Sequence, residues 1–157
     1  MIPFLNVLQY LVLALWVGSI FGFGVLFAPV VFATLPSRDQ AGTIAGNVLA
    51  RIDTLGLITG GIMLVVTALQ AIDSNWASID LGRLLTAVVM LALVILAATT
   101  VRQRLNAVRE KMGRPIDEFA PEDPLRKEYN QFHRISRLLF TVNMMLGILL
   151  IVLSALR

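Results

Sequence analysis

A chain of 157 residues in which 57% are hydrophobic and 15% are charged, with a mean hydropathy of +0.81, is not a soluble globular domain. The net charge of +3 and the pI near 10.0 would suit a nucleic-acid-binding protein, but the basic residues follow membrane topology, so no nucleic-acid partner is expected. The lack of cysteine excludes disulfides, thiolate metal sites and thiol redox chemistry.

Charged residues divide the chain into four apolar segments. No charge occurs from Ile2 to Ser37, and three further charge-free runs of 19, 18 and 19 residues follow. At about 1.5 Å rise per residue, each of these three runs matches the roughly 30 Å hydrocarbon core of a bilayer. We therefore predict an all-α integral membrane four-helix bundle, a single transmembrane domain over 1–157, with spans near 4–35, 54–72, 84–101 and 138–156.

The first span is the longest. Its extra length allows tilt, an interfacial start around Asn6 and Gln9, and a kink at Pro29. No Lys or Arg precedes it, and it is too long for the core of a signal peptide, so we expect it to be retained as a helix.

The second helix is preceded by a segment at 37–52 that is also predicted to be helical. Ser37 can cap a helix start while Gln40 reaches back to it. Two possibilities remain: the second helix begins near Ser37, or a separate interfacial helix over 37–52 leads into the span.

Small residues mark one face of each of the first two helices. Glycines four residues apart allow close helix approach, and packing within the bundle is favoured over dimerisation. The pairs are Gly18 and Gly22, Gly42 and Gly46, and Gly56 and Gly60.

The third and fourth helices should continue beyond the membrane. Asp80 is a candidate N-cap for the third, whose apolar pattern runs past Arg102 to a stop signal at Gly113. Asp123 followed by Pro124 starts the fourth. We therefore expect helices 3 and 4 to be extended into the cytoplasm as a hairpin over 102–137, closed by an exposed, mobile loop.

The basic residues predict the topology. Eleven of the 13 Lys and Arg residues lie between helices 1 and 2 or between helices 3 and 4, and only Arg83 and Arg157 lie on the other side. The positive-inside rule then predicts a multi-pass inner-membrane protein with both termini outside the cytoplasm. Arg83 is expected to pair with Asp80 or Asp73, or to extend to the headgroups.

Arginine outnumbers lysine by eleven to two, which fits contact with the phosphates of anionic lipids in the bilayer. Four arginines near the cytoplasmic surface are the candidate headgroup contacts: Arg38, Arg102, Arg104 and Arg134.

A polar stripe runs along the fourth helix. At 100° per residue, His133, Ser136 and Asn143 share a face, and Arg137 lies about 40° to the other side of His133. Asn143 lies about 9 Å deeper than Arg137, where it makes either an interhelical hydrogen bond or a contact with a substrate or ion. His133 is either a helix-end histidine bonded to a neighbouring acid or backbone group, or a functional group. Asp53, at the same level, is predicted to pair with His133 or Arg137 and completes the candidate polar cluster.

The residues available in the sequence exclude several kinds of functional site. Haem held by two histidines needs a second His that one copy of this chain lacks, and zinc lacks its Cys and His ligands. Ser136 and His133 have helical spacing but no evident oxyanion site. We therefore predict no metal, no cofactor and no catalytic residues.

A set of short motifs resembles one known family. Leu15-Trp-Val-Gly18, Ala28-Pro29, Leu35-Pro36, and His133-x-x-Ser136 followed by Asn143 are similar to the small membrane family catalogued as domain of unknown function 4149, which is related to eukaryotic transmembrane protein 205. The resemblance covers nearly the whole chain. It implies a compact four-helix membrane domain and no established reaction; the link of the eukaryotic relatives to platinum-drug resistance and trafficking implies at most a role in export.

Three functions follow as hypotheses. The leading one is a non-enzymatic inner-membrane protein that binds or stabilises a partner or a membrane complex, with the hairpin as docking surface for another protein or a second copy. The alternative is a small transporter or channel in which the polar cluster lines a cavity near the cytoplasmic side. A membrane enzyme or haem-binding redox protein is the third.

Overall fold

The computed structural model describes residues 2–156 and confirms the predicted all-α architecture, with four helical rods of 32 to 36 residues that are long and apolar enough to cross a membrane. The first rod comprises α1 (Ile2–Phe21), the π-helical segment η1 (Gly22–Phe27) and α2 (Ala28–Thr34). The second is α3 (Arg38–Asp73). The third comprises α4 (Ser78–Leu96), the π-helical segment η2 (Ala97–Val101) and α5 (Arg102–Met112). A 3₁₀ turn, η3 (Ile116–Glu118), leads to the fourth, α6 (Pro124–Ala155).

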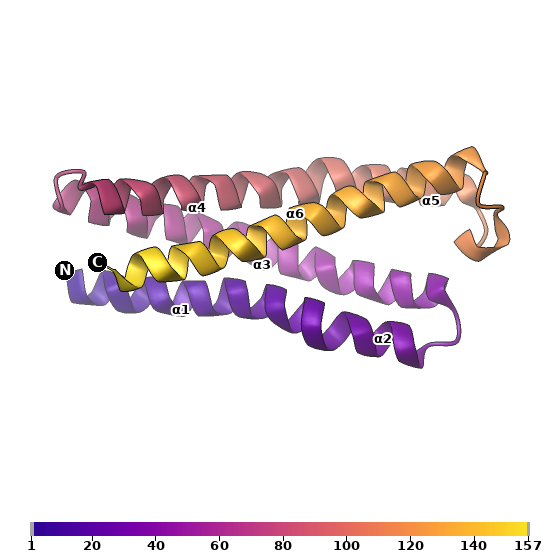
Figure 1. Ribbon diagram of the computed structural model, residues 1–157, viewed down its shortest axis with the longest axis horizontal. Helices are drawn as coiled ribbons and strands as arrows, with labels where there is room; N and C mark the ends of the chain where they lie inside the picture. The colour runs from indigo at the N-terminus through magenta and orange to yellow at the C-terminus, as the bar shows by residue number, and fades with distance from the viewer. Residues whose placement is uncertain (1, 157) are drawn as a thin grey trace.

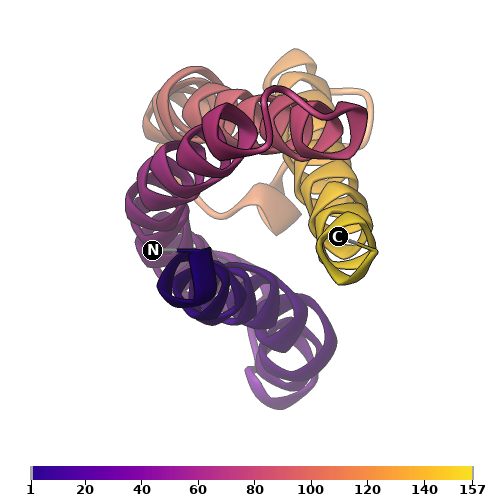
Figure 2. The ribbon, with the colours of Figure 1, turned by 90° about the vertical axis from the view of Figure 1, so that its left-hand side faces the viewer.

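The four rods form a ring. α1 contacts α3 and α6, and α4 contacts the same two helices from the other side (Figure 2). Both termini and the α3–α4 turn lie at one end of the bundle, here called the termini end, and the 35–37 and 113–123 connections lie at the other, the basic end (Figure 1). α1 and α6 run side by side at the termini end, whereas α2 diverges from α6 toward the basic end (Figure 1).

The segment at 37–52 belongs to the second helix. α3 is continuous over 36 residues, about 54 Å, and begins at Arg38 with Ser37 as its N-cap. The Ser37 hydroxyl accepts hydrogen bonds from the backbone N–H groups of Asp39 and Gln40 at 3.2 and 3.4 Å, which confirms the predicted cap. Of the two possibilities left by the sequence, the single helix is correct.

The predicted ends of the hairpin are also confirmed. Gly113 ends α5 with a φ of +61°, a left-handed conformation that favours glycine. The Asp123 carboxylate caps α6 by accepting a hydrogen bond from the backbone N–H of Leu125 at 2.8 Å. The prediction of Asp80 as an N-cap is wrong: Ala77 occupies that position, and the Asp80 side chain turns inward to Arg83.

The irregularity expected at Pro29 takes the form of a π-helical turn. Pro29 has no N–H to donate, and its ring crowds the carbonyl four residues earlier, so regular α-helix is disfavoured just before it. η1 occupies this stretch, from Gly22 to Phe27. The second π segment, η2, ends immediately before Arg102.

Packing in the core accounts for one of the predicted glycine pairs but not for another. A Cβ on Gly60 would lie 2.8 Å from Leu91 and 3.0 Å from the Trp16 ring, so Gly56 and Gly60 allow α3 to approach α1 and α4, as predicted. A Cβ on Gly18 or Gly22 would meet nothing within 4 Å, and this predicted face is not packed within the described residues.

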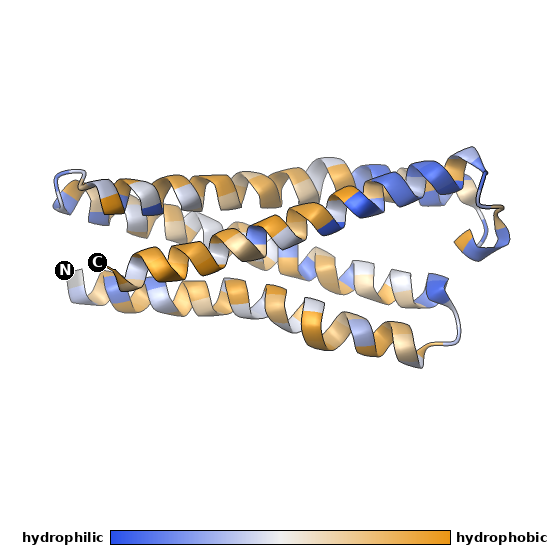
Figure 3. Ribbon diagram, in the orientation of Figure 1, coloured by the Kyte–Doolittle hydropathy of each residue, from blue (hydrophilic) through white to orange (hydrophobic). Residues whose placement is uncertain are grey.

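The outer surface fits a lipid environment over most of its length. Large apolar side chains such as Phe4, Leu11 and Leu138 are exposed on the outer faces of the rods. Hydrophilic residues gather in α5, the 113–123 connection and the first half of α6 (Figure 3). The polar part of the molecule is therefore concentrated at the basic end.

Candidate functional site

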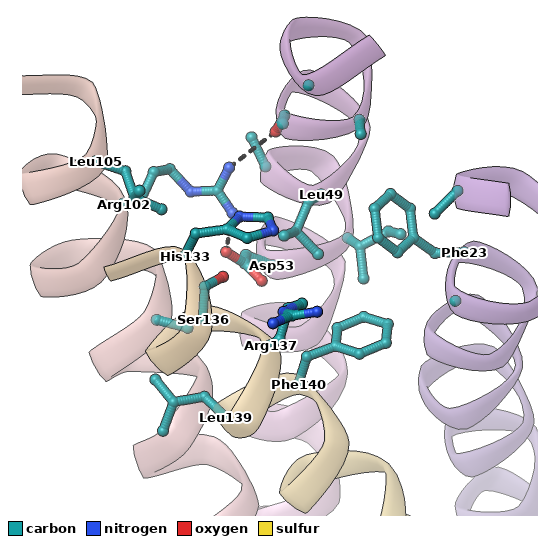
Figure 4. Close-up of a pocket in the computed structure, with 18 of the residues that line it drawn as sticks. Phe23, Leu49, Asp53, Arg102, Leu105, His133, Ser136, Arg137, Leu139 and Phe140 are labelled. Atoms are coloured by element: carbon teal, nitrogen blue, oxygen red, sulfur yellow. Dashed lines mark hydrogen bonds and ion pairs between the residues drawn. The ribbon is translucent and has the colours of Figure 1, made fainter. Parts of the chain in front are cut away.

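A cavity of about 920 Å³ lies at the basic end, and all four rods contribute to its walls. All five residues of the predicted polar cluster line it: Asp53, His133, Ser136, Arg137 and Asn143. Figure 4 shows His133, Ser136 and Arg137 on one face of α6, on the side where Asp53 approaches from α3. The stripe on α6 thus faces a cavity shared with α3.

Asp53 pairs with a residue that the sequence pattern did not indicate. Its Oδ2 accepts a hydrogen bond from Nη2 of Arg102 in an ion pair, and Nη1 of Arg102 donates to the carbonyl of Gly46 at 3.0 Å (Figure 4). The prediction that Asp53 pairs with His133 or Arg137 is wrong. From the sequence, Arg102 is expected at the lipid headgroups and not as a partner of Asp53.

His133 makes an aromatic contact. Its ring stacks on Tyr129, with centroids 6.1 Å apart and planes 6° apart, and its side chain is exposed on the cavity wall. Neither an acid nor a backbone group bonds to it among the residues that the structure describes, in contrast to the helix-end alternative. Ser136 lies one turn deeper on the same wall.

Arginine dominates the rim of the cavity. Five arginines line it, together with two carboxylates, those of Asp53 and Asp117. Arg102 is paired with Asp53, and Nη2 of Arg109 donates to Oδ1 of Asp39 at 2.7 Å. The other three lining arginines are Arg38, Arg126 and Arg137.

These three arginines leave the rim positively charged. Arg126 donates to the backbone carbonyl of Phe119, and no ion pair of Arg38 or Arg137 occurs within residues 2–156. Three guanidinium groups therefore face one further carboxylate, Asp117. The balance is an excess of positive charge that an anion can neutralise.

Two buried polar side chains, Asn143 and Trp16, lie at the floor of the cavity. The Asn143 side chain, 3% exposed, donates through Nδ2 to the Met90 carbonyl at 2.8 Å, so the predicted interhelical hydrogen bond is present. Its Oδ1 has no hydrogen-bond partner among the described residues, and neither has Nε1 of Trp16, which is 1% exposed and also lines the cavity. Both atoms are enclosed by protein, so neither lies on the surface of the cavity.

Aromatic side chains form the wall between η1 and α6. The rings of Phe23 and Phe140 meet edge to face, with centroids 5.6 Å apart (Figure 4). Nearer the basic end, Val25 and Phe32 line the cavity and are also exposed on the outer surface. The Phe23–Phe140 contact therefore closes this wall of the cavity. Between that contact and the basic end, the cavity borders the outer surface.

The four predicted headgroup arginines separate into two groups. Arg38 and Arg102 line the cavity. Arg104 and Arg134 are exposed and do not contribute to the cavity wall. Only the latter two keep the outward position assumed from the sequence.

A second polar cluster, which the sequence pattern did not reveal, is buried at the termini end. Arg83, 1% exposed, pairs with Asp80, which confirms one of its predicted alternatives, and it does not extend to the headgroups. Its Nη2 also donates to Oε1 of Gln70 at 2.7 Å and to Oε1 of Gln9. Gln9, expected at the interface, is buried and donates through Nε2 to the Ser154 hydroxyl at 2.7 Å.

This termini-end network joins all four rods, because α1, α3, α4 and α6 each contribute a side chain. Buried polar groups are stable only when they are bonded to one another, so the network fixes the helices in one arrangement. The signal for it in the sequence was weak, because Gln9, Gln70 and Ser154 are three among several amide and hydroxyl residues of the apolar runs.

Four long apolar helices around a cavity with an arginine-rich rim define a small multi-pass membrane protein. The chain belongs to the family described as Domain of unknown function (DUF4149), whose model matches residues 11–114. The match runs from α1 to the end of α5, and α6 lies beyond it. No curated protein and no solved structure matches the chain.

Proposed function

We propose that this protein is a non-enzymatic membrane protein that binds an anionic ligand in the cavity at the basic end. The observation that carries the proposal is the position of Arg137 in the cavity wall, where it has no acidic partner within residues 2–156 while Arg102 and Arg109 each have one. A guanidinium group that lines a cavity without a carboxylate is a ready partner for an anion.

The cavity opens on the cytoplasmic side in this proposal. The positive-inside rule supports that orientation, because eleven of the 13 Lys and Arg residues lie toward the basic end, within 38–51 and 102–137. The protein then lies in the inner membrane with both termini on the far side, and its ligand comes from the cytoplasm or from the inner leaflet.

The packing of the hairpin favours a ligand in the cavity over a protein that docks on the hairpin. Phe119 folds back onto Val108 and Met112 and is itself buried. Arg114 covers the Phe119 ring, with its guanidinium carbon 4.3 Å from the centroid. The apolar stripe that would recruit a partner is therefore largely covered by the hairpin's own loop.

A carrier is the second candidate, and one observation favours it. The cavity is open at one end, and the Arg83 network closes the other, which is the arrangement of a carrier in one of its two states. The same network argues against a continuous channel through a single copy of the chain. Flux of the bound ligand into proteoliposomes would separate a carrier from a binding protein.

The binding proposal is tested by what co-purifies with the protein. The wild type, Arg137→Gln and Arg134→Gln would be purified in mild detergent, and bound small molecules and lipids identified by mass spectrometry. Arg134 is the matched control, since it is exposed on the same helix and outside the cavity wall. An anionic molecule retained by wild type and Arg134→Gln but lost by Arg137→Gln supports the proposal; equal retention by all three overturns it.

A further inference from the structure

The cavity offers apolar surface as well as arginines. Its volume of about 920 Å³ is large for a small inorganic anion and lies near the upper end of the range of small-molecule pockets, about 300–1,000 Å³. Half-buried apolar side chains from all four rods line it: Phe23, Leu49, Leu105, Leu139 and Phe140 (Figure 4). Such surface gains from contact with hydrocarbon and not from contact with an anion, so the cavity fits a molecule that has both.

The cavity borders the outer surface between α2 and α6. Val25, Ala28 and Phe32 line it from the first rod, and Val25 and Phe32 are exposed. Arg137 and Thr141 line it from α6 and are exposed as well. Since α2 packs against α3 and diverges from α6, this side of the cavity is a lateral opening toward lipid (Figure 1 and Figure 2).

The lateral opening lies at the level of Arg137. The contact between the Phe23 and Phe140 rings marks one common level on the first and fourth rods. From that level, Arg137 lies three residues toward the basic end, about 4.5 Å. Val25 and Ala28 lie two and five residues in the same direction, about 3 and 7.5 Å. The backbone of Arg137 is therefore at the height of the opening.

Arg137 also lies at the boundary of the hydrocarbon. It precedes the charge-free run 138–156, whose 19 residues span about 28 Å of helix and match the bilayer core. A phospholipid of the adjacent leaflet has its phosphate at this depth and its acyl chains deeper. It can move sideways into the opening without a change of depth, so that its phosphate meets the guanidinium group and its chain meets the apolar wall.

The charges in the cavity favour an anionic headgroup over a zwitterionic one. Arg137 has no ion pair within residues 2–156. Arg38 and Arg126, which line the cavity nearer the basic end, add positive charge against the single further carboxylate of Asp117. A zwitterionic headgroup carries its own cation into this positive field and gains less from it than an anionic headgroup does.

We infer that the ligand of the proposed binding function is an anionic phospholipid of the cytoplasmic leaflet. It enters between α2 and α6, with its phosphate at Arg137 and an acyl chain against the wall formed by Phe23 and Phe140. The inference rests on the proposed function and adds the source of the anion, which is the membrane and not the cytoplasm.

The headgroup is tested by native mass spectrometry of the full chain in detergent. The protein would be titrated with phosphatidylglycerol, with phosphatidylethanolamine and with glycerol 3-phosphate. We expect phosphatidylglycerol to bind about tenfold more tightly than either of the other two, the effect of about one charge-assisted hydrogen bond. Its preference over phosphatidylethanolamine should fall below about threefold in Arg137→Gln and persist in Arg134→Gln, which alters an exposed residue outside the cavity wall.

The route of entry is tested by narrowing the lateral opening. Ala28→Trp places a large ring where Ala28 lines the cavity, whereas Val30→Trp places it on the same helix at a position that is 61% exposed and outside the cavity wall. We expect Ala28→Trp to weaken phosphatidylglycerol binding about tenfold and Val30→Trp to change it by less than about twofold. The headgroup comparison does not depend on the folding of either tryptophan variant.

The outcomes separate the inference from the proposed function. If glycerol 3-phosphate binds as tightly as phosphatidylglycerol and both are lost in Arg137→Gln, the ligand is a soluble anion: the inference is overturned and the proposed function stands. Equal binding of phosphatidylglycerol and phosphatidylethanolamine by the wild type, or of phosphatidylglycerol by Ala28→Trp and Val30→Trp, also overturns the inference. If Arg137→Gln binds every probe as Arg134→Gln does, the proposed function itself fails.

Discussion

Asp53 on α3 and Arg102 on α5 form an ion pair in the cavity wall. Because of this pair, Asp53 is not a partner for Arg137 or His133 of α6. The pair joins the second and third rods at the level where the bundle widens. Arg137, like Arg126 on the same helix, consequently lines the cavity without a carboxylate partner.

Double-mutant cycles in thermal unfolding should show which arginine Asp53 contacts. Asp53→Asn and Arg102→Gln each lower the stability by about 1–2 kcal/mol, since each leaves a partly buried charge without its partner, and the double variant is less destabilised than the sum. Asp53→Asn with Arg137→Gln gives additive effects. Coupling in the second cycle and none in the first would restore the pairing that the sequence pattern predicted.

The termini-end network should dominate the stability of the bundle. Arg83→Met leaves Asp80, Gln9 and Gln70 buried with fewer partners, so we expect a loss of about 3–5 kcal/mol in detergent. Arg104→Met, at an exposed position of α5, is the control and should change stability by less than about 0.5 kcal/mol. Equal melting temperatures for the two variants would show that the network contributes little.

Two glycines provide a matched test of helix packing. A Cβ on Gly147 would lie 2.6 Å from Val17 Cγ2, so Gly147→Ala is expected to cost about 1–3 kcal/mol, and Val17→Ala should recover part of that loss. Gly18→Ala meets nothing within 4 Å and should be neutral or stabilising by up to about 1 kcal/mol. The reverse order of the two glycine variants in a thermal-shift assay would contradict the packing of α6 against α1.

The orientation in the membrane can be read with single cysteines, because the chain has none of its own. Ala77→Cys lies at the termini end and Ala120→Cys in the hairpin, and both positions are exposed. A membrane-impermeant maleimide should label Ala77→Cys in cells with a permeable outer barrier and Ala120→Cys only after the inner membrane is opened. Labelling in the opposite order would place the cavity on the other side.

Helix boundaries were predictable because local chemistry determines them. Ser37, Gly113 and Asp123 act through backbone atoms within a few residues, so their roles follow from sequence alone. The prediction for Asp80 was wrong because an aspartate near a helix start can be a cap or a buried ion-pair partner, and the sequence does not show that Arg83 points inward.

The sequence predicted which residues belong to the candidate site but not which of them contact one another. Helical periodicity correctly grouped His133, Ser136 and Asn143 on the cavity side of α6. It could not reveal that Arg102 reaches Asp53, because the periodicity of one helix does not show which residue of another helix lies opposite. Nor could it find the Trp16 indole at the floor, whose position depends on Gly56 and Gly60 of another helix.

The π-helical turns η1 and η2 have a consequence for how this molecule can change. Each separates its rod into two stretches whose side-chain directions are offset, so in the first and third rods a rotation at the basic end need not propagate to the termini end, whereas α3 and α6 run unbroken between the two ends. The ligand-facing stretches of these two rods can thus turn about their own axes while the anchoring stretches keep their geometry.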